Sequence, residues 1–174
     1  MRRVVITGAG LVSCIGNDLA TVSQALQQGK SGLKFNPIYA EKGFKACVSG
    51  SIDEDSLDTS MIDRKLKRFL SKASLYTYLS ALQAIEQAGL SLDQVSHNPR
   101  IGVVAGSGGA STLDVVTAVD AMREKGLRGV GAMAVPKTMA STVSASRATR
   151  PQPPPPTHPI PPAPAPPPHP AAPP

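Results

Sequence analysis

Aromatic residues and cysteines are scarce in this sequence, and both shortages exclude classes of protein. The 174 residues contain no tryptophan, three tyrosines and three phenylalanines. All six aromatic residues lie between Phe35 and Tyr78, so we do not expect the stacking platforms of single-stranded nucleic-acid binders. Two cysteines, Cys14 and Cys47, make no disulfide framework. With His97, the one histidine before residue 150, they are too few for a zinc site, so no metal is expected.

Long apolar runs are also missing. The run that follows the N-terminal arginines is broken by Gly8 and Gly10, which fits neither a signal peptide nor a membrane span. We therefore expect a cytoplasmic protein of a reducing compartment, without a membrane partner. The formal net charge of +6 favours an anionic partner: nucleic acid, a phosphate group or an acidic protein.

Proline is rare until residue 150 and then dominates. Of the 18 prolines, all but three lie between Pro151 and Pro174, a stretch that contains no charged residue. Such a density of proline forbids helix and strand, and it predicts polyproline II or disordered coil. We therefore expect one globular domain over residues 1–146 and a proline-rich tail over residues 147–174.

Two explanations of this tail stay open. Its residues are mostly those with cytosine-rich codons, as a reading-frame slip or a similar sequence error in a GC-rich gene would produce. The other explanation is a genuine proline-rich ligand for modules with aromatic grooves. The composition favours the first.

Before the tail, hydrophobic periodicity alternates between strand and helix. The predicted strands are Arg3–Thr7, Phe44–Ile52 and the segment IGVVAGSGG that starts at Ile101. The first predicted helix begins after an N-cap at Asn17 and ends at Gly29. Further helices are predicted over Asp63–Phe69, Ser71–Ala88 and Thr112–Lys125. Because strand, glycine turn and helix occur twice in this order, the pattern predicts α/β layering with a mostly parallel sheet.

The first glycine turn lies in VVITGAGLVSCIGND, residues 4–18. A dinucleotide-binding loop requires Gly-x-Gly-x-x-Gly, and an acidic residue about 20 positions later. Gly8 and Gly10 fit this pattern, but Ser13 occupies the third glycine position and the acidic residue is missing. A dinucleotide-binding domain is therefore disfavoured, and a tight structural turn is the better interpretation.

The second glycine turn, VAGSGG, is close to the nucleophile elbow of hydrolases, with Ser107 as the candidate nucleophile. The histidines downstream of it, His158 and His169, both lie in the tail, which cannot position a base. Hydrolase chemistry is therefore not expected. Cys14 and Cys47 are interpreted as small buried apolar residues rather than nucleophiles.

Four separated segments together resemble the N-terminal part of a β-ketoacyl-acyl carrier protein synthase of the synthase I type. They are RRVVITGAGLVSCIGND, IDRKLKRFLSKASLYTYLSALQAIEQAGLS, NPRIGVVAGSGG and VPKTMASTVSA. The resemblance runs in order from Met1 to about Ala145. It implies a thiolase-like fold of two mixed sheets between helices, built from two related halves and working as a homodimer. This chain would supply the N-terminal half of such a layered α/β sandwich, incomplete, with a disordered proline-rich tail.

The resemblance also implies a partner and binding residues. Substrates of the family are carried on the phosphopantetheine arm of the acidic acyl carrier protein, and no further cofactor is implied. Residues at carrier-protein-binding positions are Arg64, Lys65 and Arg68, with Lys125 and Arg128 in a second basic loop. Residues at substrate-binding positions are Gly108 and Gly109 at the acyl pocket, and Thr138 and Met139, which would reach the pocket of the partner subunit.

The resemblance ends before the catalytic residues of the family. Members continue with Cys-Leu-Ala-Thr and a strand that carries the nucleophilic cysteine, followed by two histidines and a lysine. Here Ala148 and Thr149 match, and Pro151–Pro174 contains no cysteine. Acyl transfer requires that thiolate, and decarboxylation requires groups that stabilise the developing negative charge. We therefore expect no catalytic residue in this chain, and we interpret it as a truncated condensing enzyme of fatty-acid elongation. The alternative is a non-catalytic fragment that docks the carrier protein and interacts through its proline-rich tail.

Overall fold

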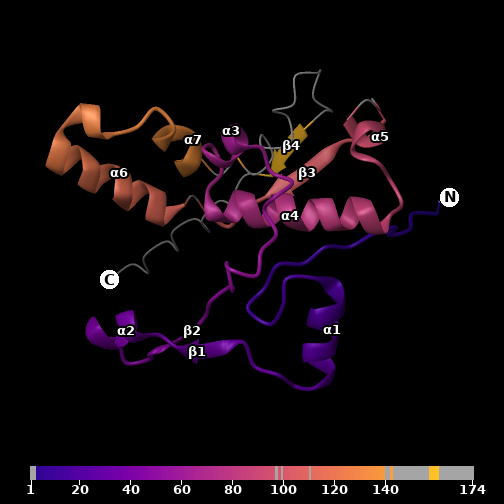
Figure 1. The fold of residues 1–174 in the computed structure, drawn as a ribbon, viewed down its shortest axis with the longest axis horizontal. Helices are drawn as coiled ribbons and strands as arrows, with labels where there is room; N and C mark the ends of the chain where they lie inside the picture. Colours follow the sequence, from indigo (N-terminus) through magenta and orange to yellow (C-terminus); the bar gives the residue numbers. More distant parts are fainter. Residues whose placement is uncertain are drawn as a thin grey trace, which may run out of the picture.

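The structure is a computed structural model, and it describes residues 3–96, 98, 100–109, 111–139, 142 and 157–160. The elements, in chain order, are α1 Leu19–Gln27, β1 Leu33–Phe35, α2 Pro37–Glu41, β2 Val48–Gly50, α3 Arg64–Lys67, α4 Lys72–Gln87, α5 Leu92–Ser96, β3 Val103–Gly106, α6 Thr112–Lys125, the 3₁₀ turn η1 Leu127–Gly129, α7 Ala134–Thr138 and β4 Thr157–Ile160. Figure 1 shows these elements in two groups. Helices α1 and α2 lie with β1 and β2 in one group, and the elements from α3 onward make the other.

The long helices lie where the sequence predicts them. Ser71 caps α4 and accepts a hydrogen bond from the backbone of Ser74, and Ser111 caps α6 in the same way. Gly89 and Gly126 follow these helices with φ of 69° and 65°, the left-handed conformation that glycine adopts without strain. The short basic helix predicted over Asp63–Phe69 is also present, over the shorter range Arg64–Lys67, with Asp63 as its N-cap.

Helix α1 is capped one residue later than predicted. Asp18, not Asn17, is the N-cap, and its carboxylate accepts hydrogen bonds from the backbone N–H and the hydroxyl of Thr21 at 2.8 and 2.6 Å. The Asn17 side chain is held elsewhere: its Nδ2 donates to the Asp53 carbonyl and to Ser56 Oγ, at 3.1 and 2.6 Å, and its Oδ1 accepts no hydrogen bond from a described residue. Two good capping residues stand side by side in the sequence, and the tertiary contact decides between them.

The mostly parallel sheet is a wrong prediction for the described residues. They form two separate two-stranded sheets, β1–β2 antiparallel and β3–β4 parallel. The predicted strand Phe44–Ile52 is shortened to β2, and its partner β1 was not predicted. Arg3–Thr7 is not a strand: the described residues offer it no pairing partner, and Val4 and Ile6 are 91% and 92% exposed. β-Branched residues favour strands, but a strand requires a neighbour to pair with.

One strand lies where proline density predicted none. β4 pairs in parallel with β3, in the register Val103↔Thr157 to Gly106↔Ile160. Thr157–Ile160 contains one proline, Pro159, and at the edge of a sheet a residue without an N–H is tolerated where that position faces away from the ladder. The remainder of the predicted disordered tail lies outside the described residues.

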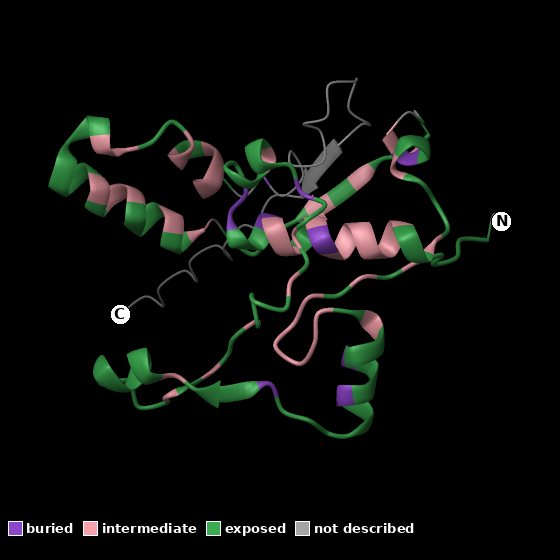
Figure 2. Ribbon diagram, viewed as in Figure 1, coloured by how far each residue is buried: buried purple, intermediate pink, exposed green. Residues whose placement is uncertain are grey.

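The core is small and lies where α3 meets α4. Ile62, Leu70 and Leu79 are buried together, and partly buried apolar side chains pack on them: Val12, Leu57, Leu66, Leu75 and Tyr78. Figure 2 shows that most of α2, β1 and α6 is exposed or half-buried. None of the described helices combines the length and the apolar character needed to cross a membrane.

Candidate functional site

Helix α3 presents its positive charges to solvent because its one apolar residue is turned to the core. Leu66 packs against the buried cluster of Ile62, Leu70 and Leu79. Asp63 fixes the beginning of the helix, since its Oδ1 accepts a hydrogen bond from the Lys65 N–H at 2.7 Å. The remaining side chains of this four-residue helix therefore point outward, and all of them are exposed.

The five cations near α3 divide into two groups. Lys67 Nζ donates to Thr59 Oγ1 at 2.8 Å, and Lys72 Nζ donates to Glu54 Oε1 at 2.5 Å. The side chains of the other three make no hydrogen bond or ion pair with any described residue; they are Arg64, Lys65 and Arg68. These three are the ones that the family resemblance predicts for carrier-protein binding. Their charges are therefore available to an external anion.

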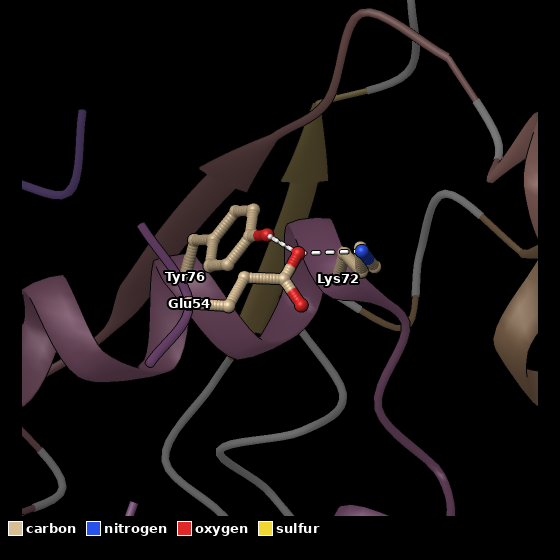
Figure 3. A network of polar contacts seen from close by, with 3 residues as sticks. All are labelled: Glu54, Lys72 and Tyr76. Carbon is tan, nitrogen blue, oxygen red and sulfur yellow. Dashed lines mark hydrogen bonds and ion pairs between the residues drawn. The ribbon is translucent and has the colours of Figure 1, made fainter. Parts of the chain in front are cut away.

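Glu54 connects the approach to α3 with the first turns of α4 (Figure 3). Its Oε1 accepts hydrogen bonds from Lys72 Nζ and from the Tyr76 hydroxyl, the latter at 2.8 Å. The hydrogen bond from Lys72, and then that from Tyr76, hold the pKa of the Glu54 carboxyl below its usual value. Partial burial and the hydrogen bond to Glu54 raise the pKa of Tyr76 to about 12. These three residues were not predicted as a group from the sequence, because the i, i+4 spacing of Lys72 and Tyr76 indicates a common helix face but does not identify Glu54 as their partner.

The second basic pair lies apart from α3. Lys125 ends α6 and Arg128 belongs to η1, and both side chains are exposed. In Figure 1 the end of α6 that carries Lys125 lies at the left of the view, whereas α3 lies beside the start of α4. The structure therefore does not bring the two predicted basic groups together within one chain.

The predicted substrate-binding residues occupy two separate places. Gly108 and Gly109 lie in an open turn after β3, and a Cβ added at either would meet no heavy atom within 4 Å. Thr138 ends α7 and donates its hydroxyl proton to the Val135 carbonyl at 2.9 Å, and Met139 follows with 50% exposure. The assignment of these four residues to substrate binding stays a prediction.

The first glycine turn packs on α4. A Cβ at Gly8 would lie 2.1 Å from the Ala84 carbonyl oxygen, and one at Gly10 would lie 1.9 Å from that of Ser80. Glycine is therefore required for the close approach of two backbones.

The N–H groups of this turn are also occupied by α4. The N–H of Ala9 donates to Gln87 Oε1 at 2.6 Å, and the N–H of Leu11 donates to Gln83 Oε1 at 2.9 Å. Ala9 and Leu11 are two residues apart in an extended segment, and Gln83 and Gln87 are four residues apart in a helix. Both spacings correspond to ~6 Å along the chain, so each N–H group meets one glutamine side chain. These contacts contradict a phosphate-binding loop, because such a loop turns its N–H groups toward the anion.

The other chemical candidates have structural contacts of their own. Cys14 packs against Gly32 and Gly50. A Cβ added at Gly32 would lie 2.6 Å from the Sγ of Cys14, and one added at Gly50 would lie 3.0 Å from it. The Cys47 thiol donates to the Phe44 carbonyl at 3.2 Å, and both cysteines are half-buried rather than buried. The Ser107 hydroxyl donates to the Gly109 carbonyl at 2.7 Å, within its own turn. Within the described part of the chain, no group of three His, Cys, Asp or Glu residues is arranged to hold a metal ion.

Comparison with known proteins gives the family. The chain matches the family described as beta-ketoacyl synthase, N-terminal domain, over residues 1–150. It is 47% identical over 150 residues to 3-oxoacyl-[acyl-carrier-protein] synthase 1 of Escherichia coli (strain K12), and 46% identical to the synthase of that name from Haemophilus influenzae. Each alignment covers 86% of this chain and 36% of the relative, so the chain spans about a third of the length of these proteins.

Solved structures show the same fold. A β-ketoacyl synthase from Burkholderia phymatum STM815 superposes with a TM-score of 0.69 at 23% identity, over 85% of this chain and 36% of that one. The ketosynthase AntDE, solved with its acyl carrier protein AntF, gives a TM-score of 0.61 at 18% identity, over 83% and 37% of the two chains. The layered α/β class and its thiolase-like type are thereby confirmed, for a part of that fold. With the family match over residues 1–150, this likeness shows that the chain belongs to the β-ketoacyl synthase family and corresponds to its N-terminal domain.

Proposed function

We propose that this chain is the N-terminal part of a condensing enzyme of fatty-acid elongation and that α3 binds its acyl carrier protein. The observation that carries the proposal is the division of cations around α3. Lys67 and Lys72 are held by internal partners, whereas Arg64, Lys65 and Arg68 are exposed without one among the described residues. A short helix that keeps three unneutralised cations in one place is suited to an acidic partner.

The comparisons support this proposal through the proteins that they name. The relatives at 46–47% identity are named as synthases of 3-oxoacyl-[acyl-carrier-protein]. AntDE was solved in complex with a carrier protein. For this chain we propose the same class of partner, delivery of the acyl group on a phosphopantetheine arm, and no cofactor beyond that arm. A homodimer, in which Thr138 and Met139 reach the partner subunit, is proposed on the family resemblance, as is a location in the cytoplasm.

We do not propose that these 174 residues catalyse condensation by themselves. The sequence contains two cysteines, Cys14 and Cys47, and the structure places both in local packing without a basic side chain as a hydrogen-bond partner. A thiolate nucleophile requires a base or a positive environment to form it. The non-catalytic docking fragment with a proline-rich tail therefore stays open as the alternative, and it shares the same docking helix.

The experiment is a binding measurement with charge reversal on α3. A fluorescently labelled bacterial acyl carrier protein, bearing its phosphopantetheine arm, is titrated with the 174-residue chain at 0.1 M and 1 M salt. The Debye length falls from about 10 Å to about 3 Å between these conditions, so an electrostatic complex should weaken strongly. Reversing Arg64 and Arg68 to Glu should weaken binding by about tenfold or more at 0.1 M salt, because two attractive contacts become repulsive.

The control reverses Lys42 and Lys45, which are exposed and whose side chains make no hydrogen bond or ion pair with described residues. Arg64→Glu/Arg68→Glu and Lys42→Glu/Lys45→Glu change the net charge equally. If both variants lose binding to the same extent, the attraction comes from net charge alone and α3 is not the docking site. Binding that is insensitive to salt would also contradict the proposal.

A further inference from the structure

The segment that carries α3 is a loop closed at its base. Glu54 and Lys72 stand at its two ends and are joined by an ion pair of 2.5 Å. Between them, Ile62, Leu66 and Leu70 fold inward against Leu79. Compact surface loops with neighbouring ends, packed by their own side chains, often carry functional groups. Here the outer side of the loop carries the three unpartnered cations of α3.

Helix α3 is too short to keep its orientation unaided, since four residues form barely one helical turn. Its C-terminal side is anchored by Leu66 and Leu70 in the core. Its N-terminal side is approached by residues 53–63, where the structure shows turns but no helix or strand. Two backbone turns, closed by Leu57 and Ile62, and side-chain contacts therefore fix this approach.

Glu54 makes the polar contact between the approach and α4, beside the apolar packing of Leu57 and Ile62 in the core. Its carboxylate accepts from Lys72 and Tyr76, which stand one turn apart on the same face of α4 (Figure 3). Next to it, Asn17 donates to the Asp53 carbonyl and to Ser56 Oγ. Further along, Lys67 donates to Thr59 and ties the approach to α3 itself. Without Glu54, the polar attachment of the approach to Lys72 and Tyr76 is lost, while the apolar packing of Leu57 and Ile62 against the core remains.

We propose that Glu54 is a positioning residue for the docking helix: by closing the loop 54–72 against Lys72 and Tyr76, it holds Arg64, Lys65 and Arg68 in the arrangement that an acidic carrier protein meets. The inference rests on the proposed function of α3. It assigns to an acidic residue a favourable effect on the binding of an acidic partner. Simple electrostatics gives the opposite sign, because a negative charge near the site repels an anion.

This difference in sign makes the test decisive. Glu54→Gln raises the net charge from +6 to +7 and removes the ion pair with Lys72. If Glu54 acts as a bare charge, the variant binds the labelled carrier protein more tightly. If Glu54 positions α3, the variant binds about two- to fivefold more weakly, the range that one exposed ion pair supplies. Its salt dependence should also become shallower, because fewer cations engage at once.

Asp55→Asn is the matched control. Asp55 is the next residue, it is exposed, and it makes no hydrogen bond or ion pair with described residues, so the variant changes the charge by the same amount. It should bind the carrier protein as well as the wild-type chain or slightly better. The double variant Glu54→Lys/Lys72→Glu, which reverses the pair at constant net charge, should restore much of the binding that Glu54→Lys alone removes.

Tryptic cleavage of the free chain measures how well the loop 54–72 is closed when no carrier protein is present. Trypsin cuts after Arg64, Lys65, Lys67 and Arg68, and a closed loop protects these bonds. Cleavage there should be faster in Glu54→Gln than in the wild-type chain and unchanged in Asp55→Asn.

If the wild-type chain binds the carrier protein and Glu54→Gln binds it equally or more tightly, the inference is overturned while the proposed function stands. If the wild-type chain does not bind, the proposed function fails, and the docking role of Glu54 fails with it.

Discussion

Tyr76 and Glu54 share one hydrogen bond, and each changes the acidity of the other. Glu54 keeps its proton less readily than a free carboxyl group because Lys72 and Tyr76 donate to its charged form. Tyr76 keeps its proton more readily, because the phenolate would be half-buried beside a carboxylate. The side chains of Lys72 and Glu54 are 56% and 49% exposed, so solvent reduces the stabilisation that this pair supplies.

The sign of the pH dependence follows from these two shifts. The contribution of Glu54, whose pKa lies below its ordinary 4.5, is present above that pH and is lost as the pH falls through the lowered pKa. The contribution of Tyr76 is present below its ordinary pKa of 10.0 and is lost as the pH rises through about 12. We therefore expect protection of the loop 54–72 from proteolysis, measured with a protease active over the range, to be greatest between these limits.

An ultraviolet titration of phenolate absorbance provides the direct measurement. The component that Tyr76→Phe removes should titrate near pH 12 in the wild-type chain. In Glu54→Gln the same component should move toward lower pH, because the neighbouring negative charge is gone. A Tyr76 component that titrates at pH 10 in the wild-type chain would contradict the contact with Glu54.

Among the elements, α4 organises more of the molecule than its apolar stripe suggests. Its apolar side contributes Leu79 to the core, and the adjacent face carries Gln83 and Gln87 against the N-terminal segment. Gln83 also donates from Nε2 to the Asn17 carbonyl at 2.7 Å. One helix therefore contacts the glycine turn, the beginning of α1 and the loop that carries α3.

Gly10→Ala tests the packing of the first glycine turn on α4. The added Cβ would lie 1.9 Å from the Ser80 carbonyl oxygen, and backbone atoms cannot move away cheaply. We expect the N-terminal segment to separate from α4, at a cost of about 1–3 kcal/mol. Hydrogen exchange at the amides of Ala9 and Leu11 should then become faster, because both lose their glutamine acceptors.

Gly108→Ala is the control for this substitution. It adds the same atom in open space and should leave these exchange rates unchanged. Equal exchange in the wild-type chain and Gly10→Ala would show that the close approach to α4 is absent in solution.

The whole molecule has far more apolar surface than its core covers. Among described residues, six apolar side chains are buried: Val22, Ala25, Ile62, Leu70, Leu79 and Val95. By contrast, Val4, Ile6 and Leu127 are more than 80% exposed. Exposed apolar groups on this scale promote association, whereas a net charge of +6 opposes it.

We therefore expect the isolated chain to associate, and to do so more strongly as salt screens its charge. Sedimentation velocity at 0.1 M and 1 M salt measures this, with binding of a hydrophobic dye as a second observable. A monomer that stays dispersed at both salt concentrations and melts in one sharp transition would contradict the prediction, because it would require a better-packed core than the structure shows.

The sequence by itself determined the features that depend on nearby residues. The boundaries of α4 and α6 follow from an apolar period, a serine cap and a following glycine, all of which act within a few residues. The basic character of α3 and the family were likewise readable, because Asp63, the run of cations and four separated motifs are all local signals.

Tertiary structure decided the features that depend on a distant partner. Arg3–Thr7 has the composition of a strand, but strand formation requires a neighbour, and the described residues supply none. Asn17 is a residue type that often caps helices, but its side chain donates hydrogen bonds to Asp53 and Ser56 instead. Glu54 carries no local sign of its role, because its partners Lys72 and Tyr76 lie 18 and 22 residues away and are brought to it by packing. A hydrogen bond stabilises whichever groups the fold brings within reach, and sequence spacing alone specifies those groups only along a single helix or turn.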